Sequence, residues 1–169
     1  MRFSPEMSSI PDPCRWWTLS LVVVVTDQAS KYAISEWLLF GSVMPITTFF
    51  NLVHFGNTGA AFSFLADAGG WQRYIFIAAA LIVSIGLVLL LRKPRPESEA
   101  LSYGLILGGA VGNLIDRAFR GHVIDYLDLH WESWHWPAFN LADMSIVGGV
   151  TLLLVSSLRS KNRRAANLR

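Results

Sequence analysis

The stretch YIFIAAALIVSIGLVLLL, from Tyr74 to Leu91, decides the fold class of this chain. It is 18 residues long and contains no charged side chain. A helix needs ~20 apolar residues to cross the hydrocarbon core of a bilayer, which is ~30 Å thick. The stretch is apolar around its whole circumference, so it lacks the polar face of a surface helix in a soluble protein. We therefore predict a transmembrane helix over residues 74–91.

Three further apolar runs repeat this pattern on both sides of it, over residues 16–33, 100–115 and 137–158. The composition agrees, because 53% of the residues are hydrophobic and 15% are charged, against ~45–50% and ~25% in soluble domains. The first run lacks the small-residue cleavage pattern of a signal peptide and is expected to remain as a span. We predict an all-α membrane protein, with four transmembrane helices in one domain that covers residues 1–169.

The distribution of basic residues predicts the orientation. Most of the 14 Lys and Arg residues precede the first span, separate the second from the third, or follow the fourth. The positive-inside rule makes these segments cytoplasmic, so both termini are expected inside and residues 36–73 and 117–136 outside. Thr, Val and Phe with glycine breakers between Met44 and Phe64 predict a small β-rich segment. The stretch His122 to Trp136 is expected to form an interfacial helix or lid.

Ionisable and amide side chains cluster at the outer ends of three expected spans. An ionised group inside a bilayer costs several kcal/mol, so such residues are usually functional. The first, third and fourth spans contribute these polar residues: Asp27, Lys31, Asn113, Asp116, Arg117, Asn140 and Asp143. The i,i+4 spacing predicts an Asp27–Lys31 ion pair, and Asp116 and Arg117 are interpreted as a second structural pair. Asp143, in contrast, has no basic residue within a turn. Such an acid is suited to share a proton with a second carboxylate.

The second carboxylate is expected from the outer segment, where Asp116, Asp125 and Asp128 are candidates. Asp125 lies within the apolar sequence VIDYL and is expected to be drawn toward the membrane. Asp128 precedes a Trp-rich stretch and is expected to be solvated. These arguments favour Asp125 and leave the other two acids open.

The sequence lacks the motifs of zinc-dependent and serine-dependent hydrolysis. No His-Glu-x-x-His zinc motif and no Gly-x-Ser-x-Gly elbow occurs in the sequence, and no metal or other cofactor is expected. A net charge of +2 without a basic, aromatic patch argues against nucleic acid. Two alternatives remain: a small transporter or channel with intramembrane ion pairs, and a non-catalytic scaffold. A transporter would need polar residues along a path through the bundle, and a scaffold leaves Asp143 unexplained.

Five motifs together resemble those of bacterial lipoprotein signal peptidase (signal peptidase II), a membrane-embedded aspartyl protease. In chain order they are DQASK (residues 27–31), NTGAAF (57–62), GGAVGNLIDR (108–117), VIDY (123–126) and FNLAD (139–143). The resemblance covers nearly the whole chain. The family more often has Phe at the position of Tyr126, a departure that leaves both acids in place.

The resemblance implies that Asp125 and Asp143 are catalytic. It further implies substrate or inhibitor binding by five residues: Asn57, Gly59, Asn113, Arg117 and Asn140. Supporting roles fall to Asp27, Lys31 and Asp116.

The implied activity is removal of the signal peptide from diacylglyceryl-modified prolipoproteins, by cleavage before the lipidated cysteine. The implied location is the bacterial cytoplasmic (inner) membrane, with the active site near the outer (periplasmic) leaflet. The implied partners are lipid-modified preprolipoproteins, membrane phospholipid and globomycin-type inhibitors. A monomer is expected.

Overall fold

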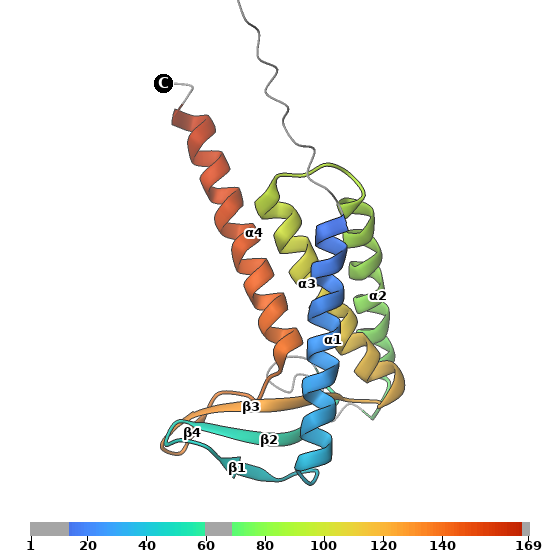
Figure 1. The fold of residues 1–169 in the computed structure, drawn as a ribbon, viewed down its shortest axis with the longest axis vertical. Helices are drawn as coiled ribbons and strands as arrows, with labels where there is room; N and C mark the ends of the chain where they lie inside the picture. Colours follow the sequence, from blue (N-terminus) through green and yellow to red (C-terminus); the bar gives the residue numbers. More distant parts are fainter. Residues whose placement is uncertain (1–13, 60–68, 167–169) are drawn as a thin grey trace, which may run out of the picture.

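The computed structural model describes residues 14–59 and 69–166, with side chains described as far as Arg159. In these residues the chain order is α1 (Cys14–Trp37), β1 (Val43–Pro45), β2 (Phe50–Asn57), α2 (Gln72–Leu91), α3 (Glu97–Phe119), β3 (Val123–Trp131), β4 (Trp134–His135) and α4 (Leu141–Ala166). The sheet lies across one end of the helices, and both described ends of the chain lie at the opposite end (Figure 1). We call these the sheet end and the terminal end.

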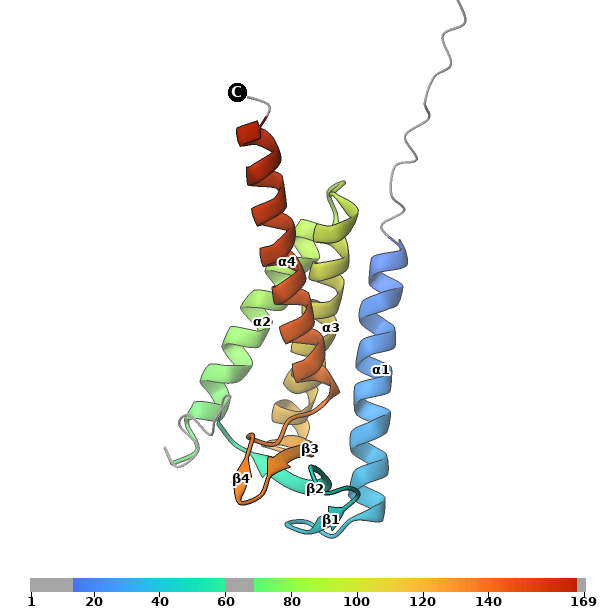
Figure 2. The ribbon, with the colours of Figure 1, turned by 90° about the vertical axis from the view of Figure 1, so that its left-hand side faces the viewer.

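Helix α3 is the centre of the bundle, because it packs against α1, α2 and α4 (Figure 2). Its glycines allow this close approach. A Cβ on Gly108 would lie 2.6 Å from the Val23 Cβ of α1, and one on Gly104 would lie 3.2 Å from the Leu19 side chain. On another side of α3, Gly109 contacts the backbone of Ala142 in α4. Small residues let helix backbones approach closely in membranes.

The four strands form one antiparallel sheet in the order β1-β2-β3-β4. The strands expected between Met44 and Phe64 are confirmed as β1 and β2, and residues 60–64 of that segment lie outside the described residues. The expected interfacial helix over residues 122–136 is wrong, because β3 and β4 lie there. The β-branched and aromatic residues of β3 suit a strand, and β2 supplies a partner for its backbone hydrogen bonds. The all-α class is therefore too narrow.

Helix boundaries differ from the expected spans, most of all for α4. This helix begins at Leu141, not at residue 137, because Phe139 is still in extended backbone and forms a β-bridge with Leu127. As a result Asp143 lies in the first turn of α4. Within residues 14–59 and 69–166, two helices are long and apolar enough to cross a membrane: α2 and residues 141–159 of α4, with mean hydropathies of 2.8 and 1.8.

Candidate active site

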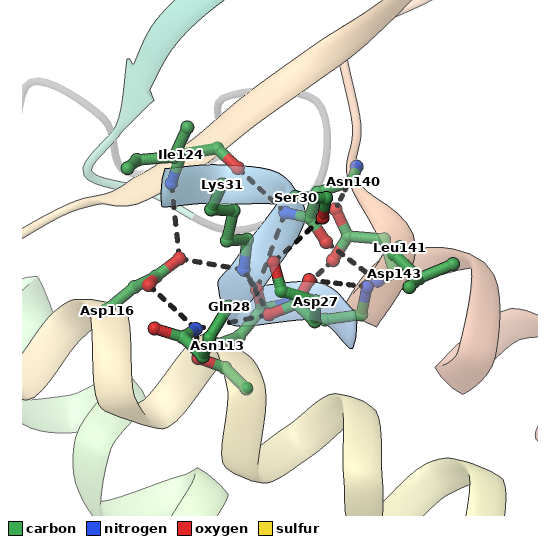
Figure 3. A network of polar contacts seen from close by, with 12 residues as sticks. Asp27, Gln28, Ser30, Lys31, Asn113, Asp116, Ile124, Asn140, Leu141 and Asp143 are labelled. Carbon is green, nitrogen blue, oxygen red and sulfur yellow. Dashed lines mark hydrogen bonds and ion pairs between the residues drawn. The ribbon is translucent and has the colours of Figure 1, made fainter. Parts of the chain in front are cut away.

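A polar cluster lies at the sheet end, where α1, α3, β3 and the first turn of α4 meet (Figure 3). Six of its side chains belong to residues that are less than a tenth exposed: Asp27, Lys31, Asn113, Asp116, Asp125 and Asn140. Buried polar groups are costly unless they are hydrogen-bonded. Each of these six side chains is bonded to other members of the cluster.

Asn140 joins the two acids singled out from the sequence. Its Nδ2 donates to Asp125 Oδ1 at 2.7 Å, and its backbone N–H donates to Asp143 Oδ2 at 3.3 Å. In return, Asn140 Oδ1 accepts from the backbone N–H of Asp143 at 2.9 Å. This reciprocal pair is a capping box, which satisfies N–H groups at the start of a helix. The cap residue of α4 therefore binds both carboxyl groups, Asp125 through its side-chain amide and Asp143 through its backbone N–H.

Asp125 is held from both sides of its carboxyl group. Besides the bond from Asn140, its Oδ2 accepts from Asn57 Nδ2 at 3.0 Å. The strand register explains this contact, because Phe55 lies opposite Asp125 and Asn57 is two residues further along β2 on the same face. Burial raises the pKa of Asp125 from 3.8 to about 7, and the neighbouring Asp143 acts in the same direction. Asp125 can therefore carry a proton near neutral pH.

Asp143 receives a side-chain donor from α3, in addition to the backbone N–H of Asn140. Asn113 Nδ2 donates to Asp143 Oδ1 at 2.8 Å. The first turn of a helix also presents partial positive charge to a carboxylate. Two neighbouring carboxyl groups with these donors are suited to hold one proton between them.

Lys31 uses all three of its ammonium protons inside the cluster. They reach Asp27 Oδ2 at 2.8 Å, Asp116 Oδ2 at 2.7 Å and Asn113 Oδ1 at 3.0 Å (Figure 3). The predicted Asp27–Lys31 pair is confirmed. Lys31 is completely buried, so its charge depends on these two carboxylates for compensation.

The predicted Asp116–Arg117 ion pair is wrong. Asp116 pairs with Lys31 and with Arg120, the C-cap residue of α3, which is four residues further along the chain. Arg117 points elsewhere, since adjacent residues do not face each other on a helix. Its Nη2 donates to Gly59 O at 2.8 Å, and its guanidinium carbon lies 5.1 Å from the centre of the Phe76 ring.

Hydrogen bonds connect three residues at the end of the site near β2. Asn57 Oδ1 accepts from the Gly59 N–H at 2.9 Å, while Gly59 O accepts from Arg117. Three predicted binding residues, Asn57, Gly59 and Arg117, are thereby linked to Asp125. The rest of this motif, residues 60–62, lies outside the described residues.

Asp128 was expected to be solvated, and this is wrong. It is buried, accepts from Asn51 Nδ2 at 2.7 Å, and lies 2.9 Å from His135 Nδ1. Three residues along a strand reverse the direction of the side chain, so Asp128 faces away from Asp125. Of the three acids left open by the sequence, Asp125 is the one that shares Asn140 with Asp143.

A family model described as signal peptidase (SPase) II matches residues 19–159 of the chain. The chain belongs to the signal peptidase II family. It is 52% identical to the lipoprotein signal peptidase of Serratia marcescens over 144 residues, and this alignment covers 85% of each protein. It is 50% identical over 159 residues to that of Cupriavidus pinatubonensis, covering 94% of this chain and 90% of the relative.

A solved bacterial membrane enzyme, determined by the in meso method at 2.3 Å resolution, has the same fold. It has a TM-score of 0.79 and 28% identity, and covers 88% of this chain and 90% of its own. This signal peptidase II family member is thus a membrane enzyme with helices and a small antiparallel sheet. The family is of aspartic-type peptidases, and the matches do not support a transporter or channel.

Sequence reasoning missed two partners in this family member. Gln28 Nε2 donates to Gly112 O and Asp116 Oδ1, both at 3.1 Å, and Gln28 Oε1 accepts from Arg120 Nη1 at 2.9 Å. Gln28 belongs to the DQASK motif, and its position between Asp27 and Lys31 could have indicated that it is part of the site. Arg120 is four residues after Asp116, and this i,i+4 spacing could have identified it.

Proposed function

We propose that Asp125 and Asp143 are the catalytic pair with which this chain cleaves diacylglyceryl-modified prolipoproteins before the lipidated cysteine. Family membership implies removal of signal peptides from prolipoproteins. The observation that supports these two acids is the bonding of both to Asn140.

The reaction needs one proton on the pair. The ionised carboxylate accepts a proton from a water molecule as the water oxygen attacks the peptide carbonyl carbon. The protonated carboxyl donates a hydrogen bond to the carbonyl oxygen, which becomes part of a tetrahedral intermediate. The C–N bond then breaks, and a proton from the pair goes to the departing amine. The two acids titrate as a coupled pair, and the raised pKa of Asp125 supports a shared proton near neutral pH.

Binding roles are proposed for residues beside the pair. Asn57, Gly59 and Arg117 border it on one side. Asn113 and Asn140 donate to its carboxyl groups and orient them. We propose that these five residues contact substrate or globomycin-type inhibitors, and that Asp27, Lys31 and Asp116 support them.

We further propose that all four helices of a single domain, residues 1–169, span the inner membrane, with both termini cytoplasmic. Basic residues at the terminal end, including Arg92 and Lys93, support this orientation. Exposed tryptophans at the sheet end, including Trp37 and Trp131, suit the outer interface. The site would then lie near the outer leaflet. Exposed apolar side chains on α2 and α4 would contact phospholipid around a monomer.

The decisive experiment is cleavage of a lipidated precursor by purified protein. Asp125→Asn and Asp143→Asn should each lower turnover ~100- to 10,000-fold, the range that positioned proton transfer contributes, while folding is retained. Asp128→Asn is the matched control, because this buried acid is on the same strand but faces away, and it should keep turnover. An active Asp125→Asn beside an inactive Asp128→Asn would reject the proposed pair.

Thiol labelling tests the orientation. In a Cys14→Ser background, a cysteine at position 70 should react with an impermeant reagent added outside intact spheroplasts. One at position 97 should react only after lysis. The reverse pattern would place the site at the cytoplasmic face.

A further inference from the structure

The start of helix α4 is held by a carboxylate from another helix. The backbone N–H of Ala142, in the first turn of α4, donates to Asp27 Oδ1 of α1 at 2.9 Å. The first N–H groups of a helix have no partner within the helix and need an acceptor from elsewhere. Asn140 Oδ1 supplies one of these acceptors, for Asp143. Asp27 supplies another, for the residue that immediately precedes Asp143.

Asp27 is itself fixed in place. Its Oδ2 accepts from Lys31 Nζ at 2.8 Å and from Gln28 Nε2 at 3.2 Å. Gly112 of α3 gives this carboxylate its space, because a Cβ at that position would lie 2.6 Å from Asp27 Oδ2. Asp27 therefore fills a gap between α1, α3 and α4 that a larger residue on α3 would close.

A second route leads from α1 to the side chain of Asp143. Lys31 can only donate, so it requires the oxygen of the Asn113 amide, and it binds Asn113 Oδ1 at 3.0 Å. The amide nitrogen must then point the other way, and it donates to Asp143 Oδ1 at 2.8 Å. Lys31 thereby determines which end of Asn113 faces Asp143 (Figure 3).

We propose that Asp27 and Lys31 are positioning residues for Asp143. Asp27 fixes the backbone of the α4 first turn, and Lys31 fixes the donor that binds the carboxyl group. Neither bond involves the reacting atoms. This inference rests on the proposed catalytic role of Asp143.

The positioning role predicts a specific kinetic signature. An error of ~1 Å in a reacting group can cost ~100-fold in rate. The proposed binding residues lie outside α4: Asn57 is in β2, Gly59 follows it, and Arg117 is in α3. They should therefore still bind the substrate. Loss of Asp27 should therefore lower kcat and leave KM almost unchanged, which is the pattern of an interaction needed mainly in the transition state.

The test compares Asp27→Ala, Asp27→Asn and Gly112→Ala with wild-type protein, using a lipidated peptide substrate. The measurements are kcat, KM, the pH dependence of kcat, and the melting temperature of each variant. Asp27→Ala should lose kcat ~100-fold and shift the pH dependence, because Asp143 moves relative to Asp125. Asp27→Asn keeps one oxygen for the Ala142 N–H, but its NH2 group would face the donors Lys31 and Gln28. It should therefore retain more activity than Asp27→Ala and less than wild-type protein. Gly112→Ala displaces the Asp27 carboxylate without removing a charge and should also lower kcat.

Ser20→Ala is the matched control for a purely structural role. Ser20 Oγ makes a buried bond from α1 to Gly104 O of α3 at 2.9 Å, away from the site. Its loss should lower the melting temperature and leave kcat per folded molecule unchanged.

Normal kcat per folded molecule in Asp27→Ala overturns the inference. A decrease in kcat no larger than the decrease in Ser20→Ala overturns it as well. If Asp27→Ala does not fold, Gly112→Ala decides by the same criterion. Asp143→Asn is run in parallel to separate the two proposals. If Asp143→Asn is active, the proposed catalytic pair fails. If Asp143→Asn is inactive while Asp27→Ala and Gly112→Ala have normal kcat, only the positioning role fails.

Discussion

The two ends of the helical bundle are buried by different means. At the terminal end, Trp16 of α1 packs with Leu87 and Leu91 of α2 and with Leu107 of α3 in an apolar cluster. At the sheet end, charged and amide side chains such as Lys31 and Asn140 are completely buried, beside apolar residues such as Val53. Apolar packing tolerates small shifts, whereas hydrogen bonds require defined directions and distances. The sheet end is therefore the part of the bundle whose geometry is specified closely enough to align two carboxyl groups.

The largest effect is expected from Lys31→Met, which removes the central charge at the sheet end. It leaves Asp27 and Asp116 without their shared cation, and breaking a buried pair costs ~3–5 kcal/mol. Unfolding in lipid–detergent mixtures should show this loss, with the exposed Lys93→Met as control. The double variant Asp27→Asn, Lys31→Met should recover part of the lost unfolding free energy. It no longer has the unpaired charge of Asp27, and Asp116 still pairs with Arg120. No recovery would mean that uncompensated charge is not the cause.

A smaller effect follows from the pKa of Asp125, which burial raises from 3.8 to about 7. The folded state holds this proton more tightly than the unfolded state. The resulting stability is fully present below about pH 4 and is lost as pH rises through about 7. Asp125→Asn should show less loss of unfolding free energy over this range, and an unchanged slope in this variant would contradict the assignment to Asp125. Turnover of wild-type protein should fall above about pH 7, as the shared proton is lost.

Close helix packing away from the charged cluster can be tested with two identical substitutions. Gly108→Ala would place its Cβ 2.6 Å from the Val23 Cβ, and overpacking of this kind costs ~1–3 kcal/mol. Gly148→Ala meets no atom within 4 Å, and Ala is favoured over Gly in a helix by up to ~1 kcal/mol. Denaturant unfolding should therefore move in opposite directions for the two variants. Equal effects would show that α1 and α3 do not need this close contact.

The smallest effect on turnover is expected at the terminal end, from truncation after Arg159. Residues 143–158 alone extend ~22 Å as a helix, which separates the tail from the site. Its basic residues contribute to orientation at ~1 kcal/mol each near an anionic surface, so insertion yield should fall. Arg117→Ala should do the opposite, with normal insertion and poor cleavage. Both are measured as turnover per inserted molecule, and an inactive tail deletion at full insertion would assign the terminal end a part in substrate binding.

Local sequence signals were sufficient where a property depends on neighbours along the chain. Apolar length predicted the helix at residues 74–91, and i,i+4 spacing predicted the Asp27–Lys31 pair. The position of polar residues near the ends of apolar runs predicted that Asp27, Asn113 and Asn140 would gather in one place. The apolar surroundings of Asp125 favoured it as the partner of Asp143. The order of the five motifs along the chain indicated the family.

Only the tertiary structure could show contacts between distant segments. The bond from Ala142 to Asp27 joins residues 115 positions apart, and no periodicity within one helix contains it. The expectation of a helix over residues 122–136 was wrong although the residues of β3 suit a strand, because a strand also needs a partner, and β2 is distant in sequence. Asp128 was misjudged because its burial depends on Asn51 and His135. Sequence determined which residues are polar inside an apolar chain, and packing decided which of their atoms meet, because hydrogen bonds depend on positions in space.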